Sequence, residues 1–498
     1  MMKRDKGITA TSELSVSEKI GYGVASTGDA VLYSASGTFF MFFLTTVAGI
    51  PPAAAGVITA IGAVWNAIYN PIMGYFADRF SSRFGRRRPL MIAAAIPLAI
   101  VFLLLFTNLA IPVAIKPIWY GLMFMLFWTC YTTFFVPYLA LGVDYTADYN
   151  QRISLRLYAS AFNQLGGLIA LSLPTALVAL LQRQGVSVNM SWSIAGGTIG
   201  AIAMVTILIT AFASKKKDIP NVAHGESNMA IGMADANSMD ANRGGACDVD
   251  EKKTGIRNGA RGGFSIKSLF FEYASVLKLS PARYLIVAST ASLIAFTILL
   301  SNCMYYFTYN LGFASEKIAT ILPLRPIITC CFIPLTSFLA RKLDKKWAFA
   351  LFNIVGMVLL LTLKACGVTG SFTLALYLLA TVCICGIYWQ IIPSVYYDIC
   401  VYDQYETGKN RQATIVSLQG LVEAAASGLG ALTLGVLLGR GGFDGSLETQ
   451  TEHAMTWIEN CATWVPTIFV AIAVICMVLY PLTRRKYEQI IQTLESDT

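Results

Sequence analysis

Long apolar stretches recur along this whole chain, and they restrict its fold more than any other feature of the sequence. Each runs for about 20 residues or more, the length that an α-helix needs to cross the hydrocarbon core of a membrane. The stretches are continuously apolar rather than alternating, which excludes the strands of a membrane barrel. The sequence therefore predicts an all-α membrane protein with twelve transmembrane helices.

The composition agrees with that prediction. Of the 498 residues, 56% are hydrophobic and 13% are charged, whereas roughly a quarter of the residues are charged in a soluble domain. The predicted spans lie at 19–48, 54–77, 89–108, 118–142, 154–182, 191–213, 284–311, 316–341, 347–368, 372–398, 412–438 and 462–483.

Basic residues mark one side of the membrane. The loops after spans two and eight are rich in them, whereas the loops on the other side contain few, such as Lys116 and Arg183. Because positively charged loops stay in the cytoplasm, both termini are predicted to be cytoplasmic. The same distribution explains the net charge of +9 by membrane topology, so this charge does not indicate nucleic-acid binding. The basic residues of the two loops are Arg79, Arg83, Arg86, Arg87 and Arg88, and then Arg341, Lys342, Lys345 and Lys346.

A polar segment divides the chain. Residues 214–262 are rich in Gly, Asn, Asp and Lys and have no apolar period, which predicts a disordered linker. Residues 264–279 are either a short amphipathic helix at the membrane surface or simply the start of span seven. The predicted parts are a cytoplasmic tail at 1–17, a six-helix bundle at 18–213, a cytoplasmic linker at 214–283, a second six-helix bundle at 284–485 and a cytoplasmic tail at 486–498.

The two halves resemble internal repeats. In each half, the second span ends in a basic loop. Span four ends with Val136-Pro137-Tyr138 before a group of charges, and span ten ends with Ile392-Pro393-Ser394 before a similar group. Two six-helix pseudo-repeats in parallel are typical of transporters that rock about a site near the membrane midplane.

These residues resemble the major facilitator superfamily, and within it the glycoside–pentoside–hexuronide:cation symporters, which include melibiose permease. The resemblance implies the major facilitator fold, a monomer, a location in the plasma membrane, and symport of a sugar, glycoside or uronide with a cation. Its motifs are Tyr22-Gly23 with Gly28-Asp29; Trp65 through Gly74 with Asp78-Arg79 and Gly85 through Pro89; Val136-Pro137-Tyr138 with Arg152; and Trp389 with Asp398, Gly408 and Arg411.

The chain also departs from the melibiose-permease-like pattern. Two aspartates of span two ligate the coupling cation in that pattern, and here the positions hold Asn66 and Asn70. A further acidic position holds Phe135. Because an amide offers oxygen but no charge, these changes favour H⁺ over Na⁺ as the coupling ion. Of the sugar-binding positions, the chain keeps Trp389 and has Ala30, Ser160 and Leu139 at others.

Three charged residues lie deep in the predicted spans, where a charge is costly and therefore suggests a function. Asp29 in span one could carry a proton, hold a polar substrate or form a fixed salt bridge. Glu423 in span eleven lies one turn from both Gln419 and Ser427 and could carry a proton or pair with Arg325. Arg325 lies beside two prolines of span eight and could bind an anionic or hydroxyl-rich substrate or form a structural ion pair.

Polar and aromatic residues complete the predicted substrate site. Asn66 and Asn70 share one face of span two and could bind a polar substrate or hydrogen-bond between helices. Trp389 could stack on a sugar ring or serve in packing. The other candidates are Tyr33, Asn163 and Gln390.

A third group of charges lies at the cytoplasmic ends of the spans. We predict that these residues are gating charges that hold one conformation and separate during rocking, with topology signals as the alternative. They are Asp78, Arg79, Asp144, Arg152, Asp398 and Arg411.

The sequence predicts a secondary transporter rather than an enzyme, because it has no nucleotide-binding or catalytic motif. The eleven cysteines have no metal-ligand spacing, and neither a metal nor another cofactor is predicted. The preferred hypothesis is a proton-coupled symporter of a sugar, glycoside or uronide. The alternatives are a carrier, either a uniporter or a symporter, of a non-sugar organic anion or amphiphile, and a membrane sensor without flux whose linker binds a partner.

Overall fold

The computed structural model describes residues 14–80, 82, 84–145, 149–214, 272–408 and 411–496. The regular structure of these residues is helical, apart from one isolated bridge between Ser82 and Gly85. Twelve of the helical stretches are long and apolar enough to cross a membrane, which confirms the predicted fold class. Most of the predicted N-terminal tail and linker, including 264–271 of the predicted amphipathic segment, lies outside the described residues. Within that segment, Glu272–Val276 is helical.

The first six spans form the N-terminal half. The first span ends in a π-helix, η1, which continues α1 without a break. The elements are α1 (Val16–Phe42), η1 (Phe43–Val47), α2 (Pro52–Arg79), α3 (Arg88–Leu105), α4 (Lys116–Asp144), α5 (Tyr149–Arg183) and α6 (Val188–Ala213).

The second six spans form the C-terminal half, and their first span also ends in a π-helix, η3. A further helix, α16 (Arg484–Ser496), follows the last span. The elements are α8 (Ser280–Tyr305), η3 (Tyr306–Asn310), α9 (Ser315–Ile321), α10 (Leu324–Leu343), α11 (Lys345–Cys366), α12 (Ser371–Thr407), α13 (Gln412–Arg440), α14 (Glu452–Ala462) and α15 (Trp464–Val478).

Three spans of the C-terminal half differ from their predicted ranges. Span eight is interrupted between α9 and α10, next to Pro323, which lies just before α10. Span ten continues to Thr407 and ends at Gly408, whose φ of 65° suits a helix C-terminus. The last span begins at Glu452, ten residues before the predicted start at 462. The prediction missed α14 because its polar residues interrupt the apolar run in the sequence.

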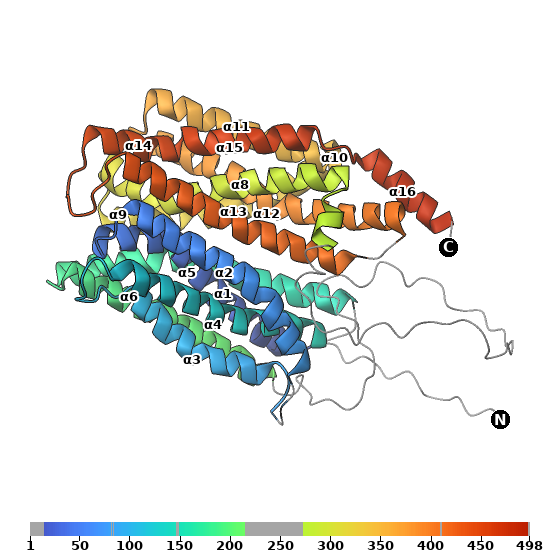
Figure 1. Cartoon of the computed structure of the whole chain (residues 1–498), viewed down its shortest axis with the longest axis horizontal. Coiled ribbons are helices and arrows are strands. Elements are labelled where there is room, and N and C mark those ends of the chain that lie inside the picture. The colour runs from blue at the N-terminus through green and yellow to red at the C-terminus, as the bar shows by residue number, and fades with distance from the viewer. Residues whose placement is uncertain are drawn as a thin grey trace.

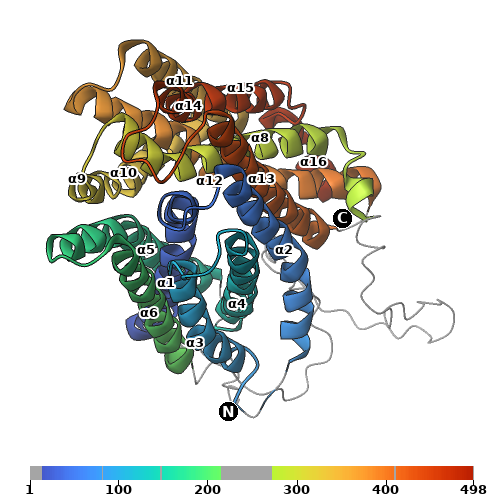
Figure 2. The ribbon, with the colours of Figure 1, turned by 60° about the vertical axis from the view of Figure 1, so that its left-hand side comes forward.

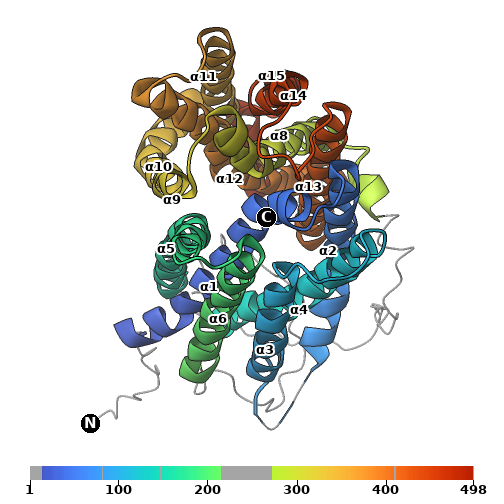
Figure 3. The same ribbon diagram turned by 90° about the vertical axis from the view of Figure 1, so that its left-hand side faces the viewer.

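The two halves lie side by side, with most of their helices running along the long axis of the molecule (Figure 1). We call the end where α1 begins and α15 ends the terminal end, at the right of Figure 1, and the other end the far end. Viewed from the far end, α2 lies next to α13, and α5 lies next to α9 (Figures 2 and 3). These pairs and α1 with α8 form the main contacts between the halves.

Close packing holds α1 at the centre of the N-terminal half. Gly28 touches α6 so tightly that a Cβ there would meet Thr206 Oγ1 and the Ala203 backbone. On the other side, a Cβ at Gly166 of α5 would lie 2.5 Å from the Thr27 carbonyl oxygen. Small residues on both faces thus allow α1 to lie between α5 and α6, and they hold the next residue, Asp29, at a defined position.

Candidate functional site

Asp29 is held by two neighbouring helices of its own half. Its Oδ1 accepts a hydrogen bond of 2.5 Å from the Tyr131 hydroxyl of α4, and its Oδ2 accepts one of 3.3 Å from Asn163 Nδ2 of α5. The structure thus brings Asp29 and Asn163 together. In the described part of the chain, no basic side chain pairs with this carboxylate, so the fixed salt bridge considered above is not seen.

Asn66 and Asn70 bond to each other and to α4. Asn70 Nδ2 donates to Asn66 Oδ1 over 2.9 Å, and Thr132 Oγ1 donates to the same oxygen over 3.0 Å. Interhelical hydrogen bonding, one of the two predicted roles, therefore occurs here. Because Tyr131 and Thr132 are consecutive, α4 connects Asn66 on α2 with Asp29 on α1.

Glu423 has a similar environment in the other half. Its Oε1 accepts hydrogen bonds from Gln419 Nε2, at 2.8 Å, and from the Tyr388 hydroxyl of α12, at 3.4 Å. Among the residues that the structure describes, Glu423 has no basic partner either, and the predicted alternative of a Glu423–Arg325 pair is not seen. Asp29 in one half and Glu423 in the other are therefore alike: each carboxyl group accepts hydrogen bonds from uncharged donors.

Tyr33 is near both carboxyl groups. It is one turn beyond Asp29 on α1, and it interacts electrostatically with both Asp29 and Glu423. Its ring meets that of Trp128 edge-on, with 6.4 Å between centroids. The side chain is still 37% exposed. Tyr33 therefore lies where the N-terminal half faces the C-terminal half.

Arg325, Phe296 and Trp389 form a second group on the C-terminal half. Arg325 lies in the first turn of α10, after the break in span eight, and its guanidinium lies 5.9 Å from the Phe296 ring centroid. Phe296 meets Trp389 edge-on at 6.2 Å, and Trp389 is 43% exposed. The neighbouring Gln390 points elsewhere, because its side chain hydrogen-bonds Thr336 of α10.

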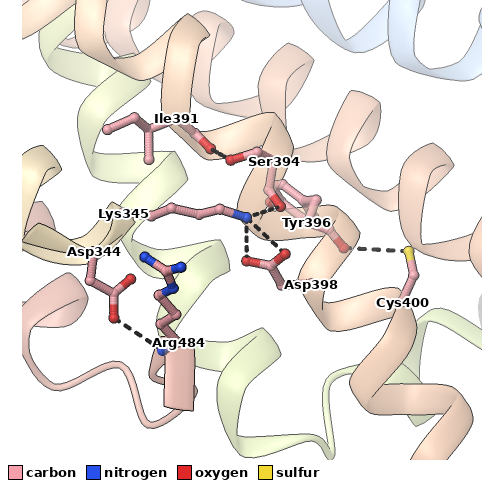
Figure 4. A network of polar contacts seen from close by, with 8 residues as sticks. All are labelled: Asp344, Lys345, Ile391, Ser394, Tyr396, Asp398, Cys400 and Arg484. Atoms are coloured by element: carbon pink, nitrogen blue, oxygen red, sulfur yellow. Dashed lines mark hydrogen bonds and ion pairs between the residues drawn. The ribbon is translucent and has the colours of Figure 1, made fainter. Parts of the chain in front are cut away.

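Two of the predicted gating charges, Asp398 and Arg411, are paired inside the C-terminal half. Lys345 Nζ lies 2.7 Å from Asp398 Oδ2 and also donates to the Ser394 carbonyl oxygen (Figure 4). Arg411 Nε donates to the buried Asp403 over 3.0 Å, and this hydrogen bond raises the pKa of the Arg411 guanidinium. The pairs therefore link α11 with α12, and α12 with the start of α13.

The remaining gating candidates lie at the terminal end of the N-terminal half. The Arg79 guanidinium lies 3.6 Å from the centroid of the Tyr75 ring. The side chains of Asp78, Asp144 and Arg152 lie outside the described part of the structure.

A pocket of about 450 Å³ also lies at the terminal end, bounded by α16 and the turn between α10 and α11. Its lining includes Asp398, Tyr480 and Arg484, and it contains neither Asp29 nor Glu423. The described residues contain no group of three His, Cys, Asp or Glu side chains that could hold a metal ion.

Comparison with known proteins now decides the family. The sequence profile described as MFS/sugar transport protein matches residues 21–232 and 247–484. The chain belongs to this family. A member of the MFS/sugar transport family is a secondary transporter. The twelve candidate spans agree with an integral membrane protein.

Curated relatives of this MFS/sugar transport protein are similar over nearly their whole length. It is 27% identical to the uncharacterized symporter YnaJ of Bacillus subtilis, over 97% of this chain and 96% of that protein. It is 21% identical to the isoprimeverose transporter of Lactiplantibacillus pentosus, over 94% and 89%. It is 23% identical to the sodium-dependent lysophosphatidylcholine symporter 1-B of Danio rerio, over 95% and 88%.

A solved structure confirms the major facilitator fold. A bacterial homologue of the human lysosomal transporter Spinster, in its inward-facing and unoccupied conformation, matches this family member with a TM-score of 0.64. The match covers 95% of this chain and 97% of that chain at 15% identity. At that identity the likeness concerns the fold alone.

Sequence reasoning missed several residues of this site in the MFS/sugar transport protein. Tyr131 and Tyr388, which donate to the two carboxyl groups, are aromatic residues in apolar runs and carry no separate signal. Thr132 belongs to a group of hydroxyl residues in span four, and this group could have indicated that span four contributes to the site. The contacts that join the halves at the far end were also missed, including the Arg183–Glu316 ion pair of 2.9 Å.

Proposed function

We propose that this protein is a monomeric, proton-coupled symporter that moves a sugar, glycoside or uronide across the plasma membrane by alternating access, with both termini in the cytoplasm. The observation that carries the proposal is the pair of carboxyl groups, Asp29 and Glu423, one in each half. Each is held by neutral hydrogen-bond donors. The proposal extends the family assignment to a coupling ion and a class of substrate.

The chemistry of these carboxyl groups supports proton coupling. An unpaired charge in the interior of a membrane protein is costly, and protonation removes that charge. A carboxyl group held by hydroxyl and amide donors can therefore take up and release a proton without breaking an ion pair. Tyr33 lies close enough to both groups to interact electrostatically with each of them.

The polar and aromatic residues of the candidate site support a hydroxyl-rich substrate. The N-terminal half offers amides and hydroxyls, chiefly those of Asn66, Asn70 and Thr132. The C-terminal half offers Trp389, which is 43% exposed, and aromatic rings of this kind stack on the apolar faces of other rings. The family description and the isoprimeverose transporter of Lactiplantibacillus pentosus also favour a sugar.

A second candidate is a carrier of an organic anion or amphiphile. Two observations favour it: the sodium-dependent lysophosphatidylcholine symporter of Danio rerio is similar over most of this chain, and Arg325 lies beside the aromatic side chain of Phe296. An amphiphile would place its anionic group on Arg325 and its apolar part against Phe296 and Trp389. The sensor without flux stays a third hypothesis, and its linker lies outside the described residues.

The test is uptake into proteoliposomes under an imposed pH gradient, and separately under an imposed Na⁺ gradient. We expect the pH gradient to drive uptake of one member of a panel of sugars, glycosides and uronides. Asp29→Asn and Glu423→Gln should abolish this concentrative uptake, because an amide cannot carry the proton. Glu452→Gln is the matched control, since Glu452 is exposed in the first turn of α14.

Each other outcome points to a different function. Uptake driven by Na⁺ alone would reject proton coupling. The Na⁺ ion would then be bound by ligands other than Asp29 and Glu423. Flux of lysophospholipids without flux of sugars would select the amphiphile carrier. Absence of flux for every solute would favour the sensor.

A further inference from the structure

We propose that the loop Gly441–Gln450, called the strap below, is the gate that closes the far end of the transporter and must leave η1 for that end to open. The strap belongs to the C-terminal half and lies on the first span of the N-terminal half. The inference rests on the proposed alternating access but not on the identity of the solute or of the coupling ion.

The strap leaves α13 in a sharp turn that the sequence requires. Gly442 has a φ of 72°, and the Phe443 amide donates back to the Leu438 carbonyl oxygen over 3.1 Å. Gly441 packs so closely on α14 that a Cβ would lie 2.7 Å from Trp457 Cβ. Two adjacent glycines therefore turn the chain from the end of α13 back over the bundle.

Hydrogen bonds within the strap make it a preformed unit. Gln450 Nε2 donates to the carbonyl oxygens of Asp444, at 2.7 Å, and Leu447, at 3.1 Å, and Gln450 Oε1 accepts from the Asp444 amide. Asp444 Oδ1 accepts from both the hydroxyl and the amide of Ser446. These bonds to Ser446 favour the ionised carboxylate and lower the pKa of Asp444. The strap can thus move as one body without losing its internal bonds.

The strap touches the N-terminal half through backbone. A Cβ on Gly445 would lie on the Thr45 carbonyl oxygen, 2.7 Å from the Thr45 carbonyl carbon and 2.9 Å from Thr46 Cα. Only a residue without a side chain can approach η1 this closely. The contact therefore depends on glycine at this position, and it joins two parts of the chain that belong to different halves.

The aromatic residues of the C-terminal half hold the strap over that contact. The Phe443 ring meets Tyr305 and Tyr309 edge-on, at centroid distances of 5.2 and 5.3 Å. Tyr305 in turn shares a hydrogen bond of 2.7 Å with Thr45 Oγ1 across the halves. Phe443 is 5% exposed and Thr45 is 1% exposed, so the strap covers Thr45.

Paired π-helices lie directly beneath the strap. η1 ends the first span of one half, and η3 ends the first span of the other. Single turns of π-helix are rare and occur frequently at functional sites. Because the strap packs on both of these turns, rocking of the halves must break one of its two contacts. Its firm attachment to Tyr305 and Tyr309 indicates that the Gly445–Thr45 contact is the one that breaks.

The test measures how fast a membrane-impermeant maleimide modifies Thr45→Cys in purified transporter, with labelling at that position followed by peptide mass spectrometry. Gly445→Ala is the test variant. Gly370→Ala is the matched control, because Gly370 lies in another loop of the far end, where a Cβ would meet nothing within 4 Å. We expect Gly445→Ala to speed labelling about tenfold, since overpacking would destabilise only the closed far end.

Equal labelling rates in Gly445→Ala and Gly370→Ala, in protein that elutes as a single dispersed species, would overturn the proposal. If Gly445→Ala does not fold, Phe443→Ala replaces it, and loss of the aromatic hold should also speed labelling. No change with folded Phe443→Ala would overturn the proposal as well. Labelling needs no substrate, so failure of the solute or proton assignment leaves this result readable on its own.

Discussion

The two ends of the transporter are held together in different ways. At the far end, the contacts cross between the halves: Thr45 bonds Tyr305, and Ser301 Oγ donates to the Gly37 carbonyl oxygen over 2.9 Å. At the terminal end, the charged pairs of the C-terminal half stay within it, as Lys345–Asp398 and Arg411–Asp403 show. The far end is therefore where one half is closed on the other.

Small residues explain how the far end closes. A Cβ on Gly435 of α13 would lie 2.5 Å from the Pro52 carbonyl oxygen and 2.9 Å from Gly56 Cα of α2. Helices in membranes associate through such close backbone approach, because lipid offers no hydrophobic drive for larger side chains. A contact of this kind involves no ion pair, so it can open without exposing unpaired charges to a low-dielectric interior. The charged pairs of the terminal end instead define the shape of a single half.

Locking the far end should have the largest effect. Arg183 and Glu316 form an exposed ion pair of 2.9 Å across the halves, so a short bismaleimide should bridge Arg183→Cys and Glu316→Cys. We expect cross-linking to abolish transport, because the far end can no longer open. Transport assays before and after cross-linking check this. The two single-cysteine variants are the controls, and full transport by the cross-linked protein would show that this end does not open.

Loosening the far end should have the next largest effect. Gly435→Ala places a Cβ against the α2 backbone, whereas at Gly439, one turn further along α13, the nearest atoms would be 3.8 Å away. An overpacking cost of about 1–3 kcal/mol in the closed state predicts about tenfold slower transport for Gly435→Ala. Gly439→Ala should transport normally. Initial uptake rates of the two variants decide the comparison, and equal rates would contradict the role assigned to Gly435.

Disrupting the terminal end should affect stability more than transport. Asp398→Asn removes the charge that faces Lys345, whose side chain is 38% exposed. We expect a loss of about 1–2 kcal/mol of stability, reduced from the value for a fully buried pair because water screens Lys345. Thermal unfolding in detergent measures it. Thiol labelling at the far end should stay unchanged, and a labelling rate that rises with Asp398→Asn would show that the two ends are coupled through this pair.

Removing an exposed charge at the far end should have the smallest effect. The side chains of Arg183 and Glu316 are 70% and 45% exposed, and exposed pairs contribute about 0–1 kcal/mol. Arg183→Ala should therefore change transport less than about twofold, at both low and high salt. A larger loss of transport in Arg183→Ala, matched by an equal loss when high salt is added to the unmodified protein, would contradict this. It would show that charge, rather than close packing, holds the far end.

Local patterns in the sequence were sufficient for the fold. Twelve apolar runs of spanning length predict twelve helices because each helix satisfies its own backbone hydrogen bonds, whatever its neighbours are. The predictions failed where a helix is not uniformly apolar. In α14, Glu459 pairs with Lys364 of α11, so a polar residue is accommodated inside a span that the apolar run alone did not include.

The site was predictable only in part. Asp29 and Glu423 were identified because a charge in an apolar run is conspicuous, and their roles stay proposals. Their donors, Tyr131 and Tyr388, could not be identified, because a tyrosine in a span looks like any packing residue until a partner helix is in place. The partner of Asp398 was equally hidden, since Lys345 is 53 residues away in the chain.

The sequence by itself determined the number of spans and the family, because these depend on residue type and spacing along one chain. Only the tertiary structure decided which end is closed and which groups meet there. Those contacts join residues far apart in sequence, such as Gly445 with Thr45, and they depend on how closely two backbones approach. A glycine that permits such an approach has the same letter in the sequence as one that faces open space, as Gly370 does.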